Sequence, residues 1–325
     1  MSMSSIMVTG ANGFVGRALA RRLQQETDIQ IRRVYRTAPR DAGDGQDISI
    51  GDIGPHSDWA KALDGINVVI HCAARVHVMN DAGSSDSLAQ FRRVNVEGTQ
   101  NLARQAVAAG VTRFVFVSSI KVNGETTTGM MPFTHASLPA PVDAYGISKW
   151  EAEQKLGEIA RETGLEVVVV RPPLVYGPGV KANFLRLMQA VNRGFPLPFG
   201  LVHNKRSMVF VENLADVLIK CAFQPRVASE TFLVSDGEDL STGRLIELLA
   251  KSMNRQPRIL NVSPALMRAF AALLGKKDFA DRLLGSLQVD IGHTRKMLDW
   301  EPPFSVEDGM SATVAPVIER FSAAR

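Results

Sequence analysis

Short apolar runs alternate with longer stretches of helical spacing through the first half of the chain. The runs lack polar alternation, which is typical of strands buried on both faces of a parallel sheet. The longer stretches Gly16–Gln25, Leu88–Ala109 and Asp143–Thr163 predict helices. Strand, helix, strand, helix is the order of a doubly wound α/β sheet. The apolar runs are Ile6–Val8, Val68–Ile70, Phe114–Val117 and Val167–Val170.

The pattern changes after Arg171. Prolines interrupt the chain at residues 172, 173, 178, 196 and 198, and the later apolar runs are fewer and shorter. We therefore expect a first domain over residues 1–172 and a smaller, mostly helical second domain over 173–325. A segment near 207–234 can return to the first domain. Helical spacing in the second half occurs at Asn183–Asn192, Val211–Phe223, Arg244–Met253 and Pro264–Leu274.

Composition and charge narrow the classes of function. Of the 325 residues, 45% are hydrophobic and 22% are charged, which excludes collagen-like and disordered chains. Lys and Arg number 37 against 33 Asp and Glu, which gives a formal net charge of +4. The basic residues are spread along the chain in short groups. We therefore expect no nucleic-acid partner and retain small phosphorylated ligands as a reason for the surplus.

Neither the cysteines nor the apolar runs indicate export or a membrane span. Cys72 and Cys221 are flanked by apolar residues, and two such cysteines support neither a disulfide framework nor a zinc site. The N-terminus lacks the pattern of a signal peptide. The most apolar stretch, Ala265–Gly275, is shorter than the about 20 residues that cross a bilayer. We expect a cytoplasmic protein without membrane insertion or bound metal.

A glycine-rich turn follows the first apolar run. Residues 9–16 read Thr-Gly-Ala-Asn-Gly-Phe-Val-Gly, and a helical stretch begins at once. Glycines let the backbone turn sharply and approach a pyrophosphate, while the helix N-terminus offers free N–H groups. A plain glycine turn is the alternative, but the position between first strand and first helix favours a Rossmann-type dinucleotide site. The residues expected at the cofactor here are Gly10, Asn12, Gly13, Phe14, Val15 and Gly16.

The end of the second predicted strand, Ile29–Tyr35, bears on the choice of cofactor. NAD-binding sites normally carry an acidic residue there for the ribose 2′-hydroxyl, whereas this chain has Arg36, with Arg40 beyond it. A guanidinium suits a 2′-phosphate by its charge and its forked donors. A solvated arginine at a strand end is the alternative. We favour NADP(H) over NAD(H).

A tyrosine and a lysine lie four residues apart at the start of a predicted helix. Tyr145 and Lys149 therefore share a helix face. An ammonium nearby and an oxidised nicotinamide both lower the pKa of a phenol, so Tyr145 can exchange a proton with a substrate oxygen. An amphipathic helix surface is the alternative. Ser118 and Ser119 follow the strand at Phe114–Val117, on the edge where ligands bind, and supply a hydroxyl donor.

These motifs together carry a resemblance to a known family. The chain resembles the extended short-chain dehydrogenases/reductases, in the group of sugar-nucleotide epimerases, dehydratases and ketoreductases. The resemblance covers nearly the whole chain. Besides the glycine turn it rests on Gly51-Asp-Ile53, His71-Cys-Ala-Ala74, Asn95-Val-Glu-Gly-Thr99, Ser118-Ser-Ile-Lys-Val-Asn-Gly124, Tyr145-Gly-Ile-Ser-Lys149, Arg171-Pro-Pro-Leu-Val-Tyr-Gly-Pro-Gly179 and Arg206-Ser-Met-Val-Phe-Val211.

The resemblance implies roles for individual residues. It makes Ser119 the hydroxyl that orients the substrate, Tyr145 the acid/base and Lys149 the residue that holds the nicotinamide ribose. It also implies a homodimer. For Arg282 an ordinary helix-surface role is equally open, and His71 is expected to pack at a strand end. The other residues implicated are Asp52 and Ile53 at the adenine, Ala73 and Ala74 under the cofactor, and Asn183, Arg206 and Arg282 at the substrate diphosphate.

Two departures from the family pattern bear on the reaction. Leu174 stands where relatives often have Asn, and Asn123 replaces the Tyr of Val-Tyr-Gly. Both weaken a direct transfer of UDP-glucose 4-epimerase activity. The Ser118–Gly124 and Arg171–Gly177 motifs together most resemble bacterial reductases of UDP-4-keto-6-deoxy-N-acetylhexosamines. With Arg36, this resemblance implies NAD(P)H-dependent reduction of the C4 keto group of such a sugar, for surface polysaccharide synthesis. A UDP-sugar 4-epimerase with tightly bound NAD is the alternative. A non-catalytic NADP(H)-sensing protein is a third hypothesis, against which the Ser–Tyr–Lys set argues.

Overall fold

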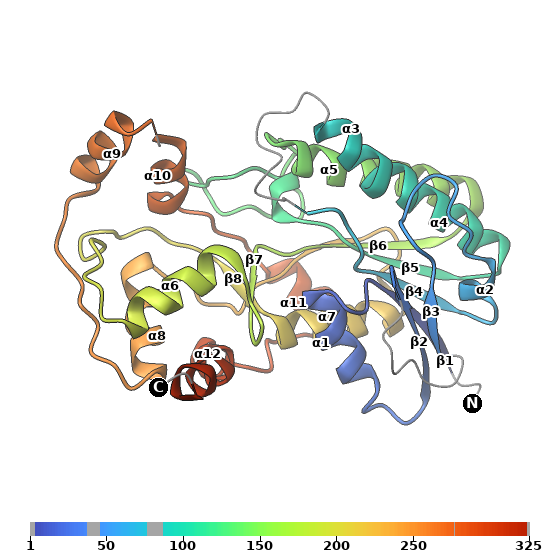
Figure 1. Cartoon of the computed structure of the whole chain (residues 1–325). Coiled ribbons are helices and arrows are strands. Elements are labelled where there is room, and N and C mark those ends of the chain that lie inside the picture. Colours follow the sequence, from blue (N-terminus) through green and yellow to red (C-terminus); the bar gives the residue numbers. More distant parts are fainter. Residues whose placement is uncertain (1–3, 38–45, 77–86, 276, 324–325) are drawn as a thin grey trace.

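A parallel sheet forms the centre of one half of the molecule in the computed structural model, which describes residues 4–37, 46–76, 87–275 and 277–323 (Figure 1). Within these ranges the sheet has seven strands in the order β3-β2-β1-β4-β5-β6-β9, and each adjacent pair is parallel. The chain extends the sheet to both sides of β1, which confirms the predicted doubly wound α/β class. The strands are β1 (Ser4–Thr9), β2 (Ile29–Tyr35), β3 (Asp47–Ser49), β4 (Val68–His71), β5 (Arg113–Val117), β6 (Glu166–Arg171) and β9 (Thr231–Leu233).

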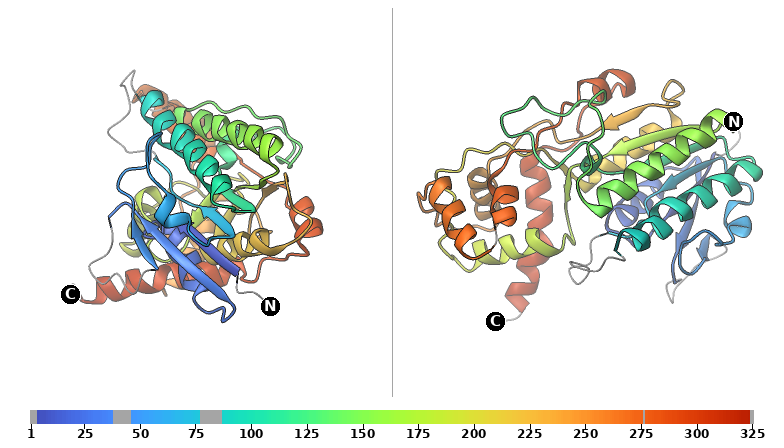
Figure 2. Two further views of the ribbon diagram at one scale, coloured as in Figure 1. Left: turned by 90° about the vertical axis from the view of Figure 1, so that its right-hand side faces the viewer. Right: turned by 90° about the horizontal axis from the view of Figure 1, so that it is seen from above.

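Helices cover both faces of this sheet, as Figure 2 shows from two further sides. α4 and α5 pack beside each other on one face, and α1 and α7 pack beside each other on the other. The predicted helix Leu88–Ala109 is in fact α3 and α4 joined by a π-helical stretch, Arg92–Glu97. The helices of this half are α1 (Phe14–Leu23), α2 (Ala60–Leu63), α3 (Ser87–Phe91), α4 (Gly98–Ala108), α5 (Ala144–Thr163), α7 (Val211–Phe223) and α11 (Gly292–Leu298).

The two faces of the sheet explain the unbroken apolar runs. In β5, Val115 and Val117 face the core beneath α1 and α7, whereas Phe114 and Phe116 face the core beneath α4 and α5. Successive side chains of a strand point to opposite faces, so a strand covered on both sides needs apolar residues at every position. The absence of polar alternation in the sequence therefore follows from the two helical layers.

The second half of the chain builds a smaller core of its own. It gathers around Tyr176, Phe184, Met188 and Phe210, between short strands and helices. The hydroxyl of Tyr176 donates to Asp236 at 2.7 Å, which satisfies this buried phenol. The elements are β7 (Leu174–Tyr176), α6 (Ala182–Asn192), β8 (Met208–Phe210), α8 (Thr242–Ser252), α9 (Pro264–Leu273), α10 (Lys277–Leu284) and α12 (Val306–Ala323).

Part of the second half lies against the sheet. β9 pairs with β6, and α7 packs on α1, so the segment expected to return near 207–234 contacts the first half. The division of the chain at residue 172 stays a prediction. In the described ranges no helix combines the length and the apolar character that a membrane span requires.

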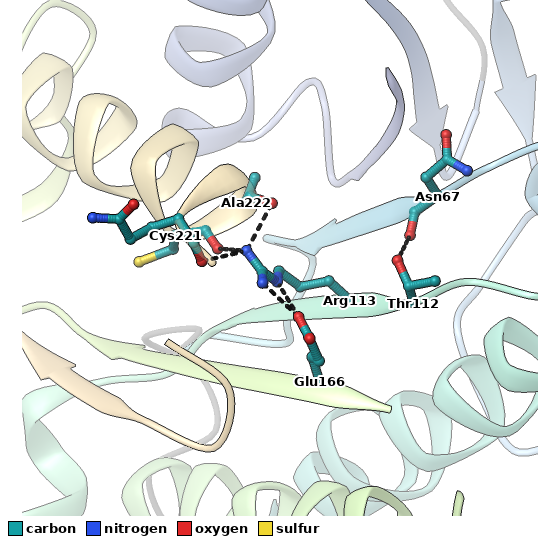
Figure 3. A network of polar contacts seen from close by, with 7 residues as sticks. Asn67, Thr112, Arg113, Glu166, Cys221 and Ala222 are labelled. Carbon is teal, nitrogen blue, oxygen red and sulfur yellow. Dashed lines mark hydrogen bonds and ion pairs between the residues drawn. The ribbon is translucent and has the colours of Figure 1, made fainter. Parts of the chain in front are cut away.

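Arg113 at the start of β5 ties α7 to the sheet (Figure 3). Its Nη1 donates to the main-chain carbonyls of Cys221, Ala222 and Gln224 at 3.2, 3.1 and 2.8 Å, and its Nε donates to Glu166 of β6 at 2.8 Å. These carbonyls end α7, where a cation also meets the negative end of the helix dipole. One buried guanidinium thus joins β5, β6 and α7.

We expect Arg113→Ala to lower the free energy of unfolding by about 3 kcal/mol, because it removes the donor from a carboxylate and from the last carbonyls of α7. Arg104→Ala is the matched control, since its guanidinium lies 3.7 Å from Glu162 and both side chains are exposed. Urea unfolding of wild type and both variants measures the difference. Equal and small losses in the two variants would contradict the structural role of Arg113.

Candidate active site

A cavity of about 970 Å³ lies where β1, β2, β4 and β5 end. The carboxyl ends of parallel strands are where ligands bind in doubly wound sheets. The structure brings together here every residue expected at the cofactor and every expected catalytic residue. Those lining the cavity are Gly10, Asn12, Gly13, Phe14, Val15, Gly16, Arg36, Asp52, Ile53, Ala73, Ala74, Ser119, Tyr145 and Lys149.

The glycine turn is packed too closely to admit side chains at two of its glycines. Gly10 has a φ of +65°, and a Cβ on it would come within 2.9 Å of the main chain of Ala73. A Cβ on Gly16 would lie 2.2 Å from the carbonyl oxygen of Gly10, so the first turn of α1 can pack against the loop only without a side chain. The N–H of Gly13 donates to that same carbonyl at 2.8 Å. This close-packed turn at a helix N-terminus fits the pyrophosphate of a dinucleotide.

Arg36 and Asp52 lie together at the β2 side of the cavity. The Nε of Arg36 is 3.1 Å from Oδ1 of Asp52, and the side chains are 78% and 89% exposed. Such an exposed pair is weak and can rearrange around a ligand. The Asp52 carboxylate could accept a hydrogen bond from the ribose 2′-hydroxyl of NAD(H), and the Arg36 guanidinium could bind the 2′-phosphate of NADP(H). The geometry alone therefore does not choose between the two cofactors. Arg40 lies outside the described residues.

The start of α5 positions Tyr145. Oδ1 of Asp143 accepts a hydrogen bond from the N–H of Gly146 at 2.7 Å and so caps the helix. The helix ends at Thr163, the predicted last residue, and Gly164 follows as its C-cap with a φ of +78°. The ring of Tyr145 meets Phe91 edge to face at a centroid distance of 6.1 Å. The cap and this contact fix the phenol one turn before Lys149.

Burial and, to a smaller extent, the Asp143 carboxylate raise the pKa of Tyr145 to about 12, although a hydrogen bond with Ser119 lowers it. The expected lowering of this pKa by Lys149 is therefore wrong for the protein alone. Its physical reason is that burial lowers the pKa of Lys149 itself to about 7, so its ammonium is only partly charged at neutral pH. A positively charged nicotinamide would favour the phenolate in this cavity.

Lys149 is almost completely enclosed. Its side chain is among the largest that are fully buried, and Nζ lies 4.2 Å from the centroid of the Phe116 ring. The Glu153 carboxylate raises its pKa and so works against burial. Glu153, one helical turn further along α5, accepts hydrogen bonds from Nε and Nη2 of Arg171 at 3.0 and 2.5 Å and from the Ser118 hydroxyl.

The network around Glu153 was not predicted. Arg171 on β6 also donates to Oδ1 of Asn123 at 3.1 Å, and Asn123 in turn donates to the Ser137 carbonyl at 3.2 Å. Asn123, the departure from the usual Val-Tyr-Gly, therefore holds a buried arginine in place. A signal was present, because Glu153 follows Tyr145 and Lys149 at helical spacing on one face of α5. The cavity also has polar lining residues that no motif indicated, namely Arg75, Gln90 and Arg93.

His71 is a structural residue at the end of β4, as expected. Its Nδ1 lies 2.7 Å from the Thr9 hydroxyl and its Nε2 lies 3.1 Å from the Thr99 hydroxyl. Burial, with a contribution from the charge of Lys149, lowers its pKa to about 3. The imidazole is therefore neutral at neutral pH and joins β1, β4 and α4.

The three residues expected at the substrate diphosphate do not line the cavity. Asn183 is exposed near the start of α6. Nη1 of Arg206 donates to the main-chain carbonyls of Arg282 and Gly285 at 2.8 and 3.1 Å, and burial lowers its pKa. Arg282 itself is exposed on α10. The structure thus joins Arg206 to the end of α10, while the role of all three at a substrate stays a prediction.

We expect Gly16→Ala to weaken NAD binding by about 100-fold or more, because the new methyl group must displace the Gly10 carbonyl and reshape the turn. Gly157→Ala on α5 is the control, since the nearest atom to its Cβ is Nη1 of the flexible Arg161 at 3.6 Å. Titration of cofactor-stripped proteins with NAD compares the two. Unchanged affinity in Gly16→Ala would rule out the role assigned to this turn.

Lys149→Met tests the buried ammonium. Because folding lowers the pKa of Lys149 from 10.5 to about 7, protonation destabilises the folded state at and below neutral pH, and this cost disappears as the pH approaches 10.5. We expect the cofactor-free variant to gain stability over wild type most at neutral pH and to lose that advantage as the pH rises. Urea unfolding across this range measures the difference, and a difference independent of pH would refute the shift.

Comparisons with known proteins agree with this geometry. The model of the NAD dependent epimerase/dehydratase family matches residues 6–234. A UDP-glucose 4-epimerase of Vibrio cholerae is 44% identical over 316 residues, which are 97% of this chain and 96% of that protein. The structure of MoeE5 in complex with UDP-glucose and NAD is 25% identical, with a TM-score of 0.75 over 98% of this chain and 100% of that one.

A further solved structure shares the fold. The UDP-glucuronic acid 4-epimerase from Bacillus cereus in complex with NAD is 20% identical, with a TM-score of 0.77 over 98% of this chain and 99% of that one. The match of the family model and the extent of the 44% identical relative settle the classification. This chain belongs to the NAD dependent epimerase/dehydratase family, a group of extended short-chain dehydrogenases/reductases.

Proposed function

We propose that this protein is a UDP-sugar 4-epimerase that keeps NAD bound between turnovers. One observation carries the proposal: a UDP-glucose 4-epimerase is 44% identical to it over 97% of this chain and 96% of its own length. That identity extends through the cofactor half and the half expected to hold the sugar nucleotide. The meeting of Ser119, Tyr145 and Lys149 at one cavity supports a reaction at a hydroxyl-bearing carbon.

The residues of the chain supply the proton chemistry. The residues of the glycine turn would hold NAD, which when bound would provide the acceptor for the C4 hydride and, once reduced, the donor for its return. The Tyr145 phenolate takes the proton of the C4 hydroxyl as that carbon becomes a ketone. The 4-keto sugar then rotates in the site so that its other face is presented, and Tyr145 returns the proton to the C4 oxygen. Ser119 donates a hydrogen bond to the same oxygen. Lys149, enclosed between Phe116 and Glu153, is proposed to hold the nicotinamide ribose, and a positively charged nicotinamide would favour the phenolate.

Three sequence features favoured net reduction, and their positions in the fold weaken that inference. Asn123 is buried beneath the site, where its side chain bonds to Arg171 and to the Ser137 carbonyl. Leu174 is half exposed on β7 and does not line the cavity. Arg36 and Asp52 form an exposed pair that gives no preference between NAD(H) and NADP(H). Because a 4-epimerase needs no net reductant, we favour NAD as the resident cofactor.

Several finer points belong to the same proposal. Asn183, Arg206 and Arg282 are proposed contacts of the UDP diphosphate, whose charge suits guanidinium groups. The protein is proposed to work as a homodimer in the cytoplasm.

The experiment is an assay of the purified protein without added cofactor. We expect it to interconvert UDP-glucose and UDP-galactose, or the corresponding N-acetylhexosamine pair. A parallel assay offers a UDP-4-keto-6-deoxy-N-acetylhexosamine with NADPH. Stoichiometric loss of NADPH there, with no C4 epimerisation in the first assay, would replace the epimerase by the 4-ketoreductase.

Tyr145→Phe should lower kcat by about 1,000-fold, because it removes the group that moves the proton while leaving the ring in place. The control is Tyr176→Phe, which removes the hydroxyl of a tyrosine bonded to Asp236 outside the cavity. Both variants should still carry NAD, read from their absorbance after purification. Full activity in Tyr145→Phe would contradict the role given to its hydroxyl. If wild type catalyses neither reaction and Tyr145→Phe changes nothing, a non-catalytic NADP(H)-sensing protein is favoured.

A further inference from the structure

We propose that α9 docks this protein on an anionic membrane surface, with its apolar face among the lipid headgroups and the basic residues around it against lipid phosphates. This goes beyond the proposed function and does not depend on it. α9 covers most of the stretch Ala265–Gly275, which is the most apolar of the chain. Figure 1 places α9 and α10 at the outer end of the second half, away from the sheet.

The outer face of α9 is apolar and exposed. Leu266, Phe270 and Leu273 recur at helical spacing and are 63%, 63% and 84% exposed, and Leu274 follows at 56%. The opposite side packs on the core through Met267 and Ala271. Contiguous exposed apolar side chains of this size mark an interaction surface rather than ordinary exposure. A helix with one face held by the protein and an apolar face outward is suited to lie in a headgroup layer.

The segment that leads into α9 also exposes apolar side chains. Leu260 is 50% exposed, and its carbonyl accepts a hydrogen bond from the N–H of Gly200 at 3.0 Å. Leu201, the next residue along, is 43% exposed. α9 packs against α10, and Arg268 lies 3.2 Å from Asp281 between the two helices. The apolar face is therefore presented from a helix that packs on its neighbour.

The charge of this part of the chain identifies the partner. Residues 253–284 contain six Lys or Arg against two Asp, so they account for the entire formal net charge of +4. Among them Arg255, Arg258 and Lys277 are exposed and have no role in the proposed function. Basic residues beside an inserted apolar face are the combination that recognises anionic lipids. A second copy of the chain docked by the same face would bring these like charges together, which disfavours self-association.

The test is sedimentation of the full-length protein with lipid vesicles. We expect binding to vesicles made of equal parts phosphatidylcholine and phosphatidylglycerol, little binding to phosphatidylcholine alone, and weaker binding as salt rises. Two sets of variants test the apolar face and the basic residues separately.

Phe270→Ser/Leu273→Ser should lower the affinity for the anionic vesicles by about tenfold or more. Arg258→Gln and Lys277→Gln should each lower that affinity by about fivefold. Leu138→Ser is the control, because this leucine is 86% exposed in a loop outside the α9 region and its loss should change nothing.

Thermal unfolding curves verify that the variants fold, and this control does not rely on any assay of catalytic activity. Failure of wild type to bind the anionic vesicles overturns the proposal. So does equal binding by Phe270→Ser/Leu273→Ser. A change of molecular mass in solution caused by that double variant would also overturn it, since a second copy would then be the occupant of α9. Inactivity towards UDP-sugars bears only on the proposed function.

Discussion

The burial of the Lys149 ammonium is the interaction on which the site depends. A lone buried charge is costly, so the surroundings must compensate it. They do so with the face of Phe116 on β5 and with Glu153 on the next turn of α5, which is itself fixed by Arg171 on β6. α5 cannot slide along the sheet without breaking this set. Because Tyr145 lies one turn before Lys149, the same constraint places the phenol at the strand ends, beside Ser119.

Features that lie within one segment could be predicted from the sequence. The glycine turn and the four-residue spacing of Tyr145 and Lys149 are local, and the predicted strand Ile29–Tyr35 coincides with β2. Features made by distant segments could not. Glu153, Arg171 and Asn123 come from three parts of the chain, and their contacts exist only in the fold. The strands β3, β7, β8 and β9 have three residues each, too few to show a period, and pairing with a neighbour defines them.

The predictions about charged groups were the ones that the structure changed most. The expectation that Lys149 lowers the pKa of Tyr145 neglected burial, which acts on both groups and leaves the lysine only partly charged. The net surplus of +4 pointed to phosphates, and Arg36 was assigned to one of them. In the structure Arg36 pairs with Asp52 at an exposed site, while the segment around α9 and α10 carries the surplus. Both differences arise because the sequence gives the sign of each group but not its partners or its exposure.

On the proposed mechanism, C4 is oxidised and reduced again on one enzyme by one retained cofactor. The decisive experiment incubates the protein with UDP-glucose deuterated at C4, without added NAD or NADP. We expect UDP-galactose that keeps the deuterium at C4, detected by mass spectrometry and NMR. UDP-galactose without deuterium at C4, or no product unless a reduced cofactor is added, would contradict it.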